Sequence, residues 1–190
     1  MLSQAEVAKI FQDTGALLSG HFRLTSGRHG DQYFQCALVL QHPQYTEILC
    51  RELAARFQGE GVSVVIGPAM GGIIVAYETA RALGARSLFT ERENGVMKLR
   101  RSFTIQPGEK VLVVEDVITT GGSVKEVIEV VRALGGEVVG VGFLVDRSNG
   151  TANLGVRTEA LLTMQVLSYT PEECPLCKQG LPAVKPGSRS

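Results

Sequence analysis

The strongest constraint on the fold is an alternation of apolar runs and amphipathic segments between residues 62 and 147. Apolar, β-branched runs predict strands at residues 62–67, 86–91, 110–117 and 137–147, and helical periodicity predicts helices at residues 71–84 and 123–136. Continuous apolar strands joined by crossover helices are typical of a parallel sheet covered on both faces. We therefore predict an α/β fold: an open, mostly parallel twisted sheet flanked by helices, with ligands bound beyond the carboxyl ends of its strands.

The segment before this alternation has a different pattern. Residues 3–18 have apolar residues near helical spacing, with Ser3 and Glu6 in a capping-box arrangement, so they predict a leading helix. Residues 20–40 indicate strand, turn and strand, and residues 45–57 predict a second helix. A chain of 190 residues suits one well-buried core with a small appendage. We expect a single domain over residues 1–180, a core sheet at about 60–148, and a loosely held tail at 181–190.

Charge and hydropathy exclude several classes of partner. Lys plus Arg and Asp plus Glu each number 19, so no net charge attracts the chain to nucleic acid or to an acidic membrane. The N-terminus lacks the pattern of a signal peptide, and no run approaches the ~20 apolar residues that span a bilayer. We expect a soluble, cytoplasmic protein with neither a nucleic acid nor a membrane as partner.

The four cysteines are too few for a disulfide framework in a chain of this size. Cys174 and Cys177 have the spacing of metal ligands, but structural zinc usually takes four ligands and the sequence shows no second pair. His21, His29 and His42 would contribute only if the fold brought them to the C-terminal segment. We interpret the pair as reduced thiols in a surface turn.

The stretch VLVVEDVITTGGSV, residues 111–124, contains the most chemistry. Glu115 and Asp116 at the end of a buried strand suit ribose hydroxyls or a hydrated Mg²⁺, although alternation in a regular strand would point them to opposite faces. An acid that caps the following turn is the alternative. Thr119 to Ser123 precede a helix, where free amides and glycines suit a phosphate; an N-cap alone would explain Ser123.

VLVVEDVITTGGS closely resembles the phosphoribosyl-diphosphate signature of type I phosphoribosyltransferases. This resemblance implies that the two acids hold the ribose hydroxyls and the loop holds the 5′-phosphate, and that IGPAMGG, residues 66–72, receives the pyrophosphate. Many relatives carry a lysine in that second loop, whereas this chain has Met70 and Gly71; a tight strand-to-helix turn is the alternative reading. The residues expected to bind phosphoribosyl diphosphate are Glu115, Asp116, Val117, Ile118, Thr119, Thr120, Gly121, Gly122, Ser123, Ala69, Met70, Gly71, Arg92 and Lys98.

Other segments resemble the orotate-specific members of that family. GHFRLTSGRHGDQYF is similar to their N-terminal hood, which implies a small hood built from residues 1–40 and the C-terminal segments, and VDRSNG is similar to the segment whose arginine meets the substrate carboxylate. Arg147, Thr119, Tyr33 and Phe34 are the expected orotate-binding residues, and Thr25 replaces a frequent lysine. The alternatives are a surface ion pair between Arg147 and Asp146 and a core position for the two aromatic residues.

ERENGVMKLRRSF lies where these enzymes have a mobile, cation-bearing loop that reaches across a dimer interface. Alternation in an extended segment puts Lys98 and Arg100 on one face and Met97 and Leu99 on the other. We expect Lys98, with Arg100, to face the pyrophosphate, and Arg92 and Arg101 are the remaining candidates. Lys98, Arg100 and Asp116 are therefore the predicted catalytic residues. A solvated charged face is the alternative.

The resemblance implies transfer of ribose 5-phosphate from phosphoribosyl diphosphate to N1 of orotate, with release of pyrophosphate, in pyrimidine biosynthesis by a homodimer. Mg²⁺ is the implied cofactor, held mainly through substrate and water, with Asp116 as the candidate protein ligand. A phosphoribosyltransferase for a purine or for uracil is the nearest alternative. A non-catalytic regulator that senses phosphoribosyl diphosphate is the other; neutral charge and the lack of room for an extra domain disfavour it.

Overall fold

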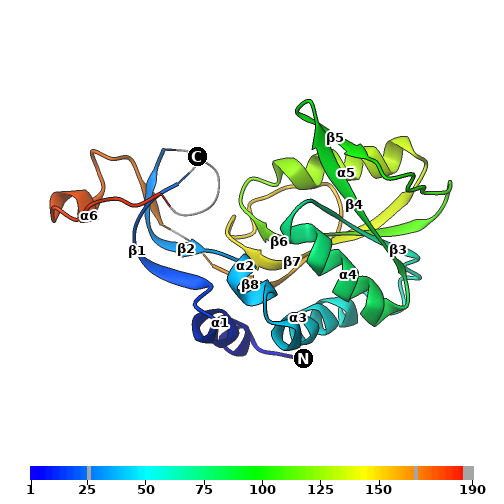
Figure 1. The fold of residues 1–190 in the computed structure, drawn as a ribbon, viewed down its shortest axis with the longest axis horizontal. Coiled ribbons are helices and arrows are strands. Elements are labelled where there is room, and N and C mark those ends of the chain that lie inside the picture. Colours follow the sequence, from blue (N-terminus) through cyan, green and yellow to red (C-terminus); the bar gives the residue numbers. More distant parts are fainter. Residues whose placement is uncertain (25–26, 165–166, 186–190) are drawn as a thin grey trace.

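The computed structural model describes residues 1–24, 27–164 and 167–185. Its main sheet has the strand order β5-β4-β3-β6-β7-β8, and all neighbouring strands are parallel except β4 and β5, which form an antiparallel hairpin (Figure 1). The predicted fold class is confirmed. The strands of this sheet are β3 (Val64–Pro68), β4 (Arg86–Glu93), β5 (Val96–Leu99), β6 (Lys110–Ile118), β7 (Glu137–Asp146) and β8 (Thr158–Thr163).

Helices cover both faces of this sheet. One face packs against α1 (Gln4–Asp13), α2 (Ala37–Leu40), α3 (Pro43–Ala55) and α4 (Gly71–Leu83), and the other against α5 (Gly122–Ala133). β6 contributes to both cores because its side chains alternate: Leu112 and Val114 face the first group of helices, whereas Val111 and Val113 face α5. All four are fully buried, which accounts for the apolar run in the sequence.

The leading helix is shorter than the sequence predicted. Its capping box is present, since the backbone N–H of Ser3 donates to the Glu6 carboxylate and that of Glu6 donates to the Ser3 hydroxyl. The helix ends at Asp13, and Gly15 follows with a φ of 68°, a left-handed conformation that suits glycine. Leu17 and Leu18 therefore begin a strand, although their spacing continues the helical pattern.

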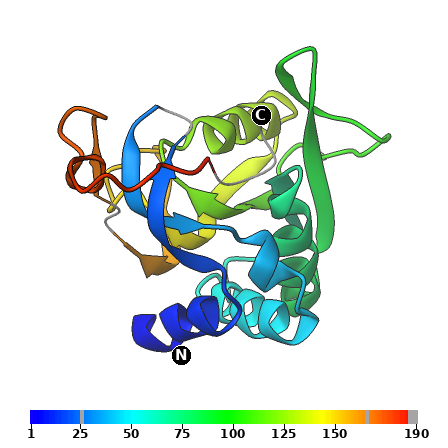
Figure 2. The ribbon, with the colours of Figure 1, turned by 60° about the vertical axis from the view of Figure 1, so that its left-hand side comes forward.

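The front segment and the C-terminal segment together form a hood beside the main sheet. Its three antiparallel strands are β1 (Leu17–Arg23), β2 (His29–Phe34) and β9 (Ser168–Tyr169), followed by a single turn of helix, α6 (Pro175–Lys178). Figure 2 shows the C-terminal segment crossing β1. There Val184 accepts from the backbone N–H of Arg23 and donates to the carbonyl of His21, each at 2.8 Å. Leu181 and Val184 thus bond this part of the tail to the hood, and a loosely held tail over 181–190 stays a prediction; Thr25 and residues 186–190 lie outside the described residues.

The interpretation of Cys174 and Cys177 as a surface turn is wrong. Cys174 is 0% exposed, and the hood strands bring His21 and His29 against the two thiols. Among the described residues, no helix is long and apolar enough to cross a membrane.

Candidate active site

The candidate site lies at the carboxyl ends of β3 and β6, which are neighbours at the centre of the main sheet. From β3 the chain crosses over to β4 on one side, and it later returns to place β6 on the other side. Such a change of direction leaves a crevice beyond the strand ends, because the two following helices pack on opposite faces. The loop after β3, residues 69–70, and the loop after β6, residues 119–121, meet at this crevice.

The second of these loops presents backbone amides at the start of α5. Gly121 is the N-cap in a left-handed conformation, with φ at 80°, and a Cβ there would lie 2.9 Å from the Cδ2 atom of Leu154. Glycine is therefore required at this position, and Ser123 is not the helix cap. The loop borders a pocket of about 250 Å³ lined by Arg92, Glu115, Glu126 and residues 117–124. A helix N-terminus with free amides suits a phosphate here.

Glu115 and Asp116 point to different neighbours, as alternation in a strand requires. β6 continues through them to Ile118, with Glu115 opposite Phe143 and Val117 opposite Val145. Glu115 lines the loop pocket, whereas Asp116 lies against Gly71 and accepts a hydrogen bond from the Cys36 thiol. The two carboxyl groups nevertheless lie close enough to share a hydrogen bond, so they occupy adjoining parts of one crevice.

The surroundings of Asp116 desolvate its carboxylate. Burial raises the pKa of Asp116, and a hydrogen bond shared with the Glu115 carboxyl group acts in the opposite direction. Weaker effects of the same sign come from the Val117 backbone N–H, which donates at 2.9 Å, and from the Cys36 thiol. Cys36 in turn has its pKa raised by burial and by the charge of Asp116. A hydroxyl donor or a cation at Asp116 would restore the solvation that the fold removes from it. No sequence pattern indicated Cys36, because only the packing of α2 in the core brings it to β6.

The loop after β3 packs directly onto both acids. A Cβ at Gly71 would collide with the Asp116 carboxylate, and one at Gly72 would lie 3.3 Å from the Oε1 atom of Glu115. The peptide bond between Ala69 and Met70 is cis, and the Met70 side chain is 80% exposed. With Met70 and Gly71 in place of a cation, only backbone amides and a flexible apolar side chain face the crevice from this side.

Arg147 follows β7 and is joined to the last residue of β6, since its backbone N–H donates to the Ile118 carbonyl at 2.9 Å. Ile118 directly precedes residues 119–121, the loop predicted to bind phosphate and called the phosphate loop below. It does not form a surface ion pair with Asp146. That carboxylate caps the turn by accepting from the backbone N–H groups of Ser148, at 2.6 Å, and Gly150, at 3.0 Å. The Nε atom of Arg147 is buried and has no hydrogen-bond partner among the described residues. Burial lowers the pKa of Arg147, so the guanidinium is a desolvated cation that lacks a counter-ion there.

The two predicted aromatic residues have separate positions. Tyr33 is partly exposed and close enough to Arg147 to interact with it electrostatically. Phe34 is 3% exposed and packs edge-to-face on Phe11, with ring centroids 5.6 Å apart. The structure thus assigns Phe34 to the core. Thr119 is exposed in the phosphate loop, on the same side of the sheet ends as Arg147.

The segment expected to be a mobile loop is the β4–β5 hairpin, and its cations are in ion pairs. Lys98 and Arg100 both bind Glu93, at 2.7 and 3.2 Å, which confirms that they share one face, and the Met97 side chain is buried on the other. Arg101 binds Glu91. These three cations do not line the loop pocket.

Arg92 is the hairpin cation at the phosphate loop. It makes two hydrogen bonds of 2.8 Å to Glu126 of α5, and both side chains line the pocket. Glu126 was not predicted as a site residue, although its position three residues after Ser123 puts it one helical turn into α5.

Comparison with known proteins agrees with this geometry. The family model for the phosphoribosyl transferase domain matches residues 39–155. Orotate phosphoribosyltransferases from Pelotomaculum thermopropionicum and Desulforamulus reducens are 75% and 76% identical over 188 residues, covering 99% of this chain and 99% and 98% of theirs. The chain belongs to the orotate phosphoribosyltransferase family. The crystal structure of orotate phosphoribosyltransferase from Aeropyrum pernix superimposes with a TM-score of 0.71 at 29% identity, over 84% of this chain and 94% of that one.

In this member of the orotate phosphoribosyltransferase family, the domain model matches the core of the chain, whereas the full-length relatives also match the hood. The domain model covers α3, α4, α5 and the sheet from β3 to β7, which include both loops, the two acids and Arg147. The hood strands β1, β2 and β9 lie outside that model but inside the full-length matches. Both loops, the two acids and Arg147 thus belong to the shared domain, whereas the hood strands are matched only by the full-length relatives.

Proposed function

We propose that this chain transfers ribose 5-phosphate from phosphoribosyl diphosphate to N1 of orotate, giving orotidine 5′-monophosphate and pyrophosphate. The observation that carries the choice of acceptor is Arg147, a desolvated guanidinium with an unpartnered Nε atom at the edge of the phosphate loop. Guanidinium and carboxylate groups pair in a bidentate geometry, so the orotate carboxylate completes this site. A neutral purine or uracil ring lacks that carboxylate.

The donor fits the crevice in one orientation. The amides of residues 119–123 bind the 5′-phosphate, and the carboxylates of Glu115 and Asp116 accept hydrogen bonds from the ribose hydroxyls. The backbone N–H of Ala69 donates to the Thr90 carbonyl, so the amides of Met70 and Gly71 receive the pyrophosphate on the α4 side of the acids. This arrangement leaves the anomeric carbon between the two loops, open toward Arg147 and Tyr33.

In the reaction, the anionic N1 of orotate forms a bond to the anomeric carbon as the bond from that carbon to the pyrophosphate oxygen breaks. Positive charge develops on the ribose ring, and the nearby Glu115 and Asp116 carboxylates stabilise it. Negative charge accumulates on the leaving pyrophosphate. We assign its stabilisation to Lys98 and Arg100, which lie on one face of an exposed hairpin.

Mg²⁺ suits the donor set, because Mg²⁺ prefers oxygen ligands and keeps several waters. Asp116 is the protein carboxylate that would hold it, since the crevice desolvates this group and leaves one side partly exposed. When bound, the ion would neutralise the charge of the diphosphate.

We further propose a homodimer with shared active sites. Lys98, Arg100 and Arg101 lie on the β4–β5 hairpin outside the loop pocket of their own chain. A hairpin that reaches into the crevice of a second copy would bring these cations to the pyrophosphate there.

A base-specificity assay tests the proposal. Purified protein with phosphoribosyl diphosphate and Mg²⁺ is expected to consume orotate, followed by absorbance, and to leave uracil, hypoxanthine and adenine unchanged. Arg147→Gln should consume orotate far more slowly at orotate concentrations below KM, and Arg132→Gln, at an exposed position in the last turn of α5, should keep the wild-type rate. Transfer to a purine would overturn the choice of acceptor, and wild-type protein that binds the donor but transfers it to no base would favour a regulator.

A further inference from the structure

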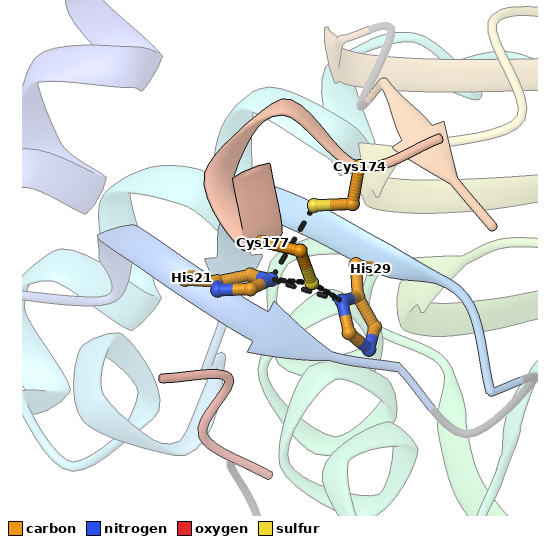
Figure 3. A group of neighbouring side chains, drawn as sticks. All are labelled: His21, His29, Cys174 and Cys177. Carbon is orange, nitrogen blue, oxygen red and sulfur yellow. Dashed lines mark hydrogen bonds between the residues drawn. The ribbon is translucent and has the colours of Figure 1, made fainter. Parts of the chain in front are cut away.

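Two histidines and two cysteines from distant parts of the chain converge inside the hood. His21 lies in β1 and His29 begins β2, whereas Cys174 precedes α6 and Cys177 lies within it (Figure 3). One potential ligand atom from each residue lies within 4.8 Å of those of the other three. This cluster belongs to neither the crevice nor the phosphate loop.

The spacing of the four atoms matches a tetrahedral metal centre. The His21 Nε2 atom lies 2.9 Å from His29 Nδ1, 3.4 Å from the Cys174 sulfur and 3.7 Å from the Cys177 sulfur, and His29 Nδ1 lies 3.2 Å from the Cys177 sulfur. With zinc–nitrogen bonds of about 2.0–2.1 Å and zinc–sulfur bonds of about 2.3 Å, tetrahedral ligands lie about 3.3–3.8 Å apart. A small outward movement of the two imidazoles would give this geometry.

Hydrogen bonding alone does not account for the convergence. The Nδ1 atom of His21 lies 2.7 Å from the Leu181 carbonyl, which can only accept, so this nitrogen is protonated. In the neutral imidazole, the Nε2 atom then presents a single lone pair to three neighbours: His29, Cys174 and Cys177. One lone pair satisfies one donor, whereas one cation satisfies all four groups. The carbonyl also orients the imidazole, as the partners of metal-bound histidines commonly do.

Burial and composition favour a structural site over a catalytic one. His21 and His29 are each 7% exposed, Cys174 is 0% exposed and Cys177 is partly exposed. Four protein ligands leave no position for substrate or water, and two thiolates with two imidazoles are a set that zinc prefers.

Few apolar side chains of the hood are buried in the hydrophobic core. Of its described residues in 17–34 and 168–185, Leu17 and Phe34 belong to the hydrophobic core clusters, and both lie at the end next to the main sheet. A small unit with few buried apolar side chains is commonly stabilised by a metal or by disulfides. The cysteines of the cluster are free, which leaves the metal.

We propose that His21, His29, Cys174 and Cys177 bind one Zn²⁺ ion that fastens the C-terminal segment to the β1–β2 hairpin. The ion holds β1 and β2 in place at the end of the hairpin far from the main sheet. Tyr33, the hood residue that faces Arg147, is in β2 and is thereby positioned indirectly.

Metal content of the full-length protein is the first test. Wild-type protein purified without chelators is expected to contain one zinc per chain, measured by mass spectrometry of dissolved metals. His29→Ala and Cys177→Ser should each lose it, whereas the matched variants His42→Ala and Cys50→Ala should keep it. Zinc retained by the double variant His29→Ala/Cys177→Ser, or wild-type protein that takes up no zinc when supplied with it, would overturn the proposal.

Spectroscopy on the wild-type chain avoids variants that fail to fold. Chelated protein refilled with Co²⁺ should show the visible bands of tetrahedral cobalt with thiolate charge transfer; an octahedral spectrum or none would contradict the site. Cys36 and Cys50 are 3% and 0% exposed, whereas Cys177 is partly exposed, so thiol reagents reach Cys177 first in the native protein and then Cys174 once the cluster opens. Bound zinc should protect Cys174 and Cys177 from the thiol reagent, and removal of zinc by a chelator should allow both to react. A Cys174–Cys177 disulfide, detected by intact mass after alkylation, would also refute the proposal.

Discussion

The carboxylate of Asp116 occupies the space that a side chain at Gly71 would need. A Cβ at residue 71 would meet both carboxylate oxygens and the carbon between them, so the loop after β3 packs on the acid at the end of β6 with no room to spare. The loop proposed to receive the pyrophosphate and the acid proposed to hold the ribose are therefore packed directly against each other. A substitution that displaces the loop at Gly71 should therefore also displace the Asp116 carboxylate.

Gly71→Ala tests this coupling. The added methyl group should displace either Asp116 or the first turn of α4, and overpacking of this kind costs about 1–3 kcal/mol in the free energy of unfolding. In an Asp116→Ala background the space is vacant, so the same substitution should cost little. A double-mutant cycle by urea unfolding measures the difference. Equal losses in both backgrounds would show that the collision is not the cause.

The same displacement should reduce activity. Gly71→Ala is expected to lower kcat/KM for phosphoribosyl diphosphate by on the order of 100-fold, because misplacement of reacting groups by about 1 Å has that effect. Steady-state kinetics at saturating orotate provide the measurement. A variant that is destabilised but retains wild-type kcat/KM would remove Asp116 from donor binding.

Arg147 is expected to contribute to orotate binding while lowering the stability of the folded protein. Arg147→Gln should lower kcat/KM for orotate by on the order of 100-fold, mainly through KM, because the substrate carboxylate loses its partner. The substitution removes a desolvated cation with an unpartnered Nε atom, so it should not reduce the free energy of unfolding. Arg132→Gln is the matched control for both measurements. A variant that is strongly destabilised would instead mean that Arg147 has a structural partner.

The β6–α5 stretch was predictable because its information is local. Fourteen consecutive residues contain the buried strand, both acids and the glycine loop, and the structure has them in that order. The pairing of Arg92 with Glu126 and the contact between Cys36 and Asp116 join segments that are distant in sequence, so no pattern indicated them. The cluster of two histidines and two cysteines joins the most distant segments, since Cys174 lies 153 positions after His21. Periodicity misled where Leu17 and Leu18 continued a helical stripe past Gly15. The strand predicted to run to residue 40 ends at Phe34, because Ala37–Leu40 form α2.

Asp116 should make the protein less stable as the pH rises. Burial raises its pKa in the folded state above the ordinary value of 3.8, so the native protein binds this proton more tightly than the unfolded chain does. The stabilisation is fully present below pH 3.8 and is lost as the pH rises through the folded pKa. Asp116→Asn does not ionise at this position, so its free energy of unfolding should rise relative to that of the wild type as the pH increases from 3.8 through the folded pKa of Asp116. Urea unfolding at several pH values measures the gap; a gap independent of pH would contradict the desolvation of Asp116.

Shared active sites predict complementation between two inactive variants. Lys98→Ala removes a cation of the hairpin and Asp116→Asn alters the crevice, so each homodimer should have low activity. Lys98 and Asp116 lie on separate elements, so each substitution should affect only its own part of the site. Loss of the exposed Lys98–Glu93 ion pair should change the free energy of unfolding little. If the hairpin of one chain serves the crevice of the other, a mixed dimer contains one site with both residues intact.

Mixing the two variants under conditions that allow subunit exchange should therefore restore orotate consumption that neither variant shows alone. The control is a mixture of Lys98→Ala with the double variant Lys98→Ala/Asp116→Asn, in which no site regains Lys98 and the rate should remain low. Because exchange must be demonstrated, one variant carries an affinity tag and the mixed dimer is isolated before assay. An isolated mixed dimer without restored activity would place Lys98 in the site of its own chain or outside the mechanism.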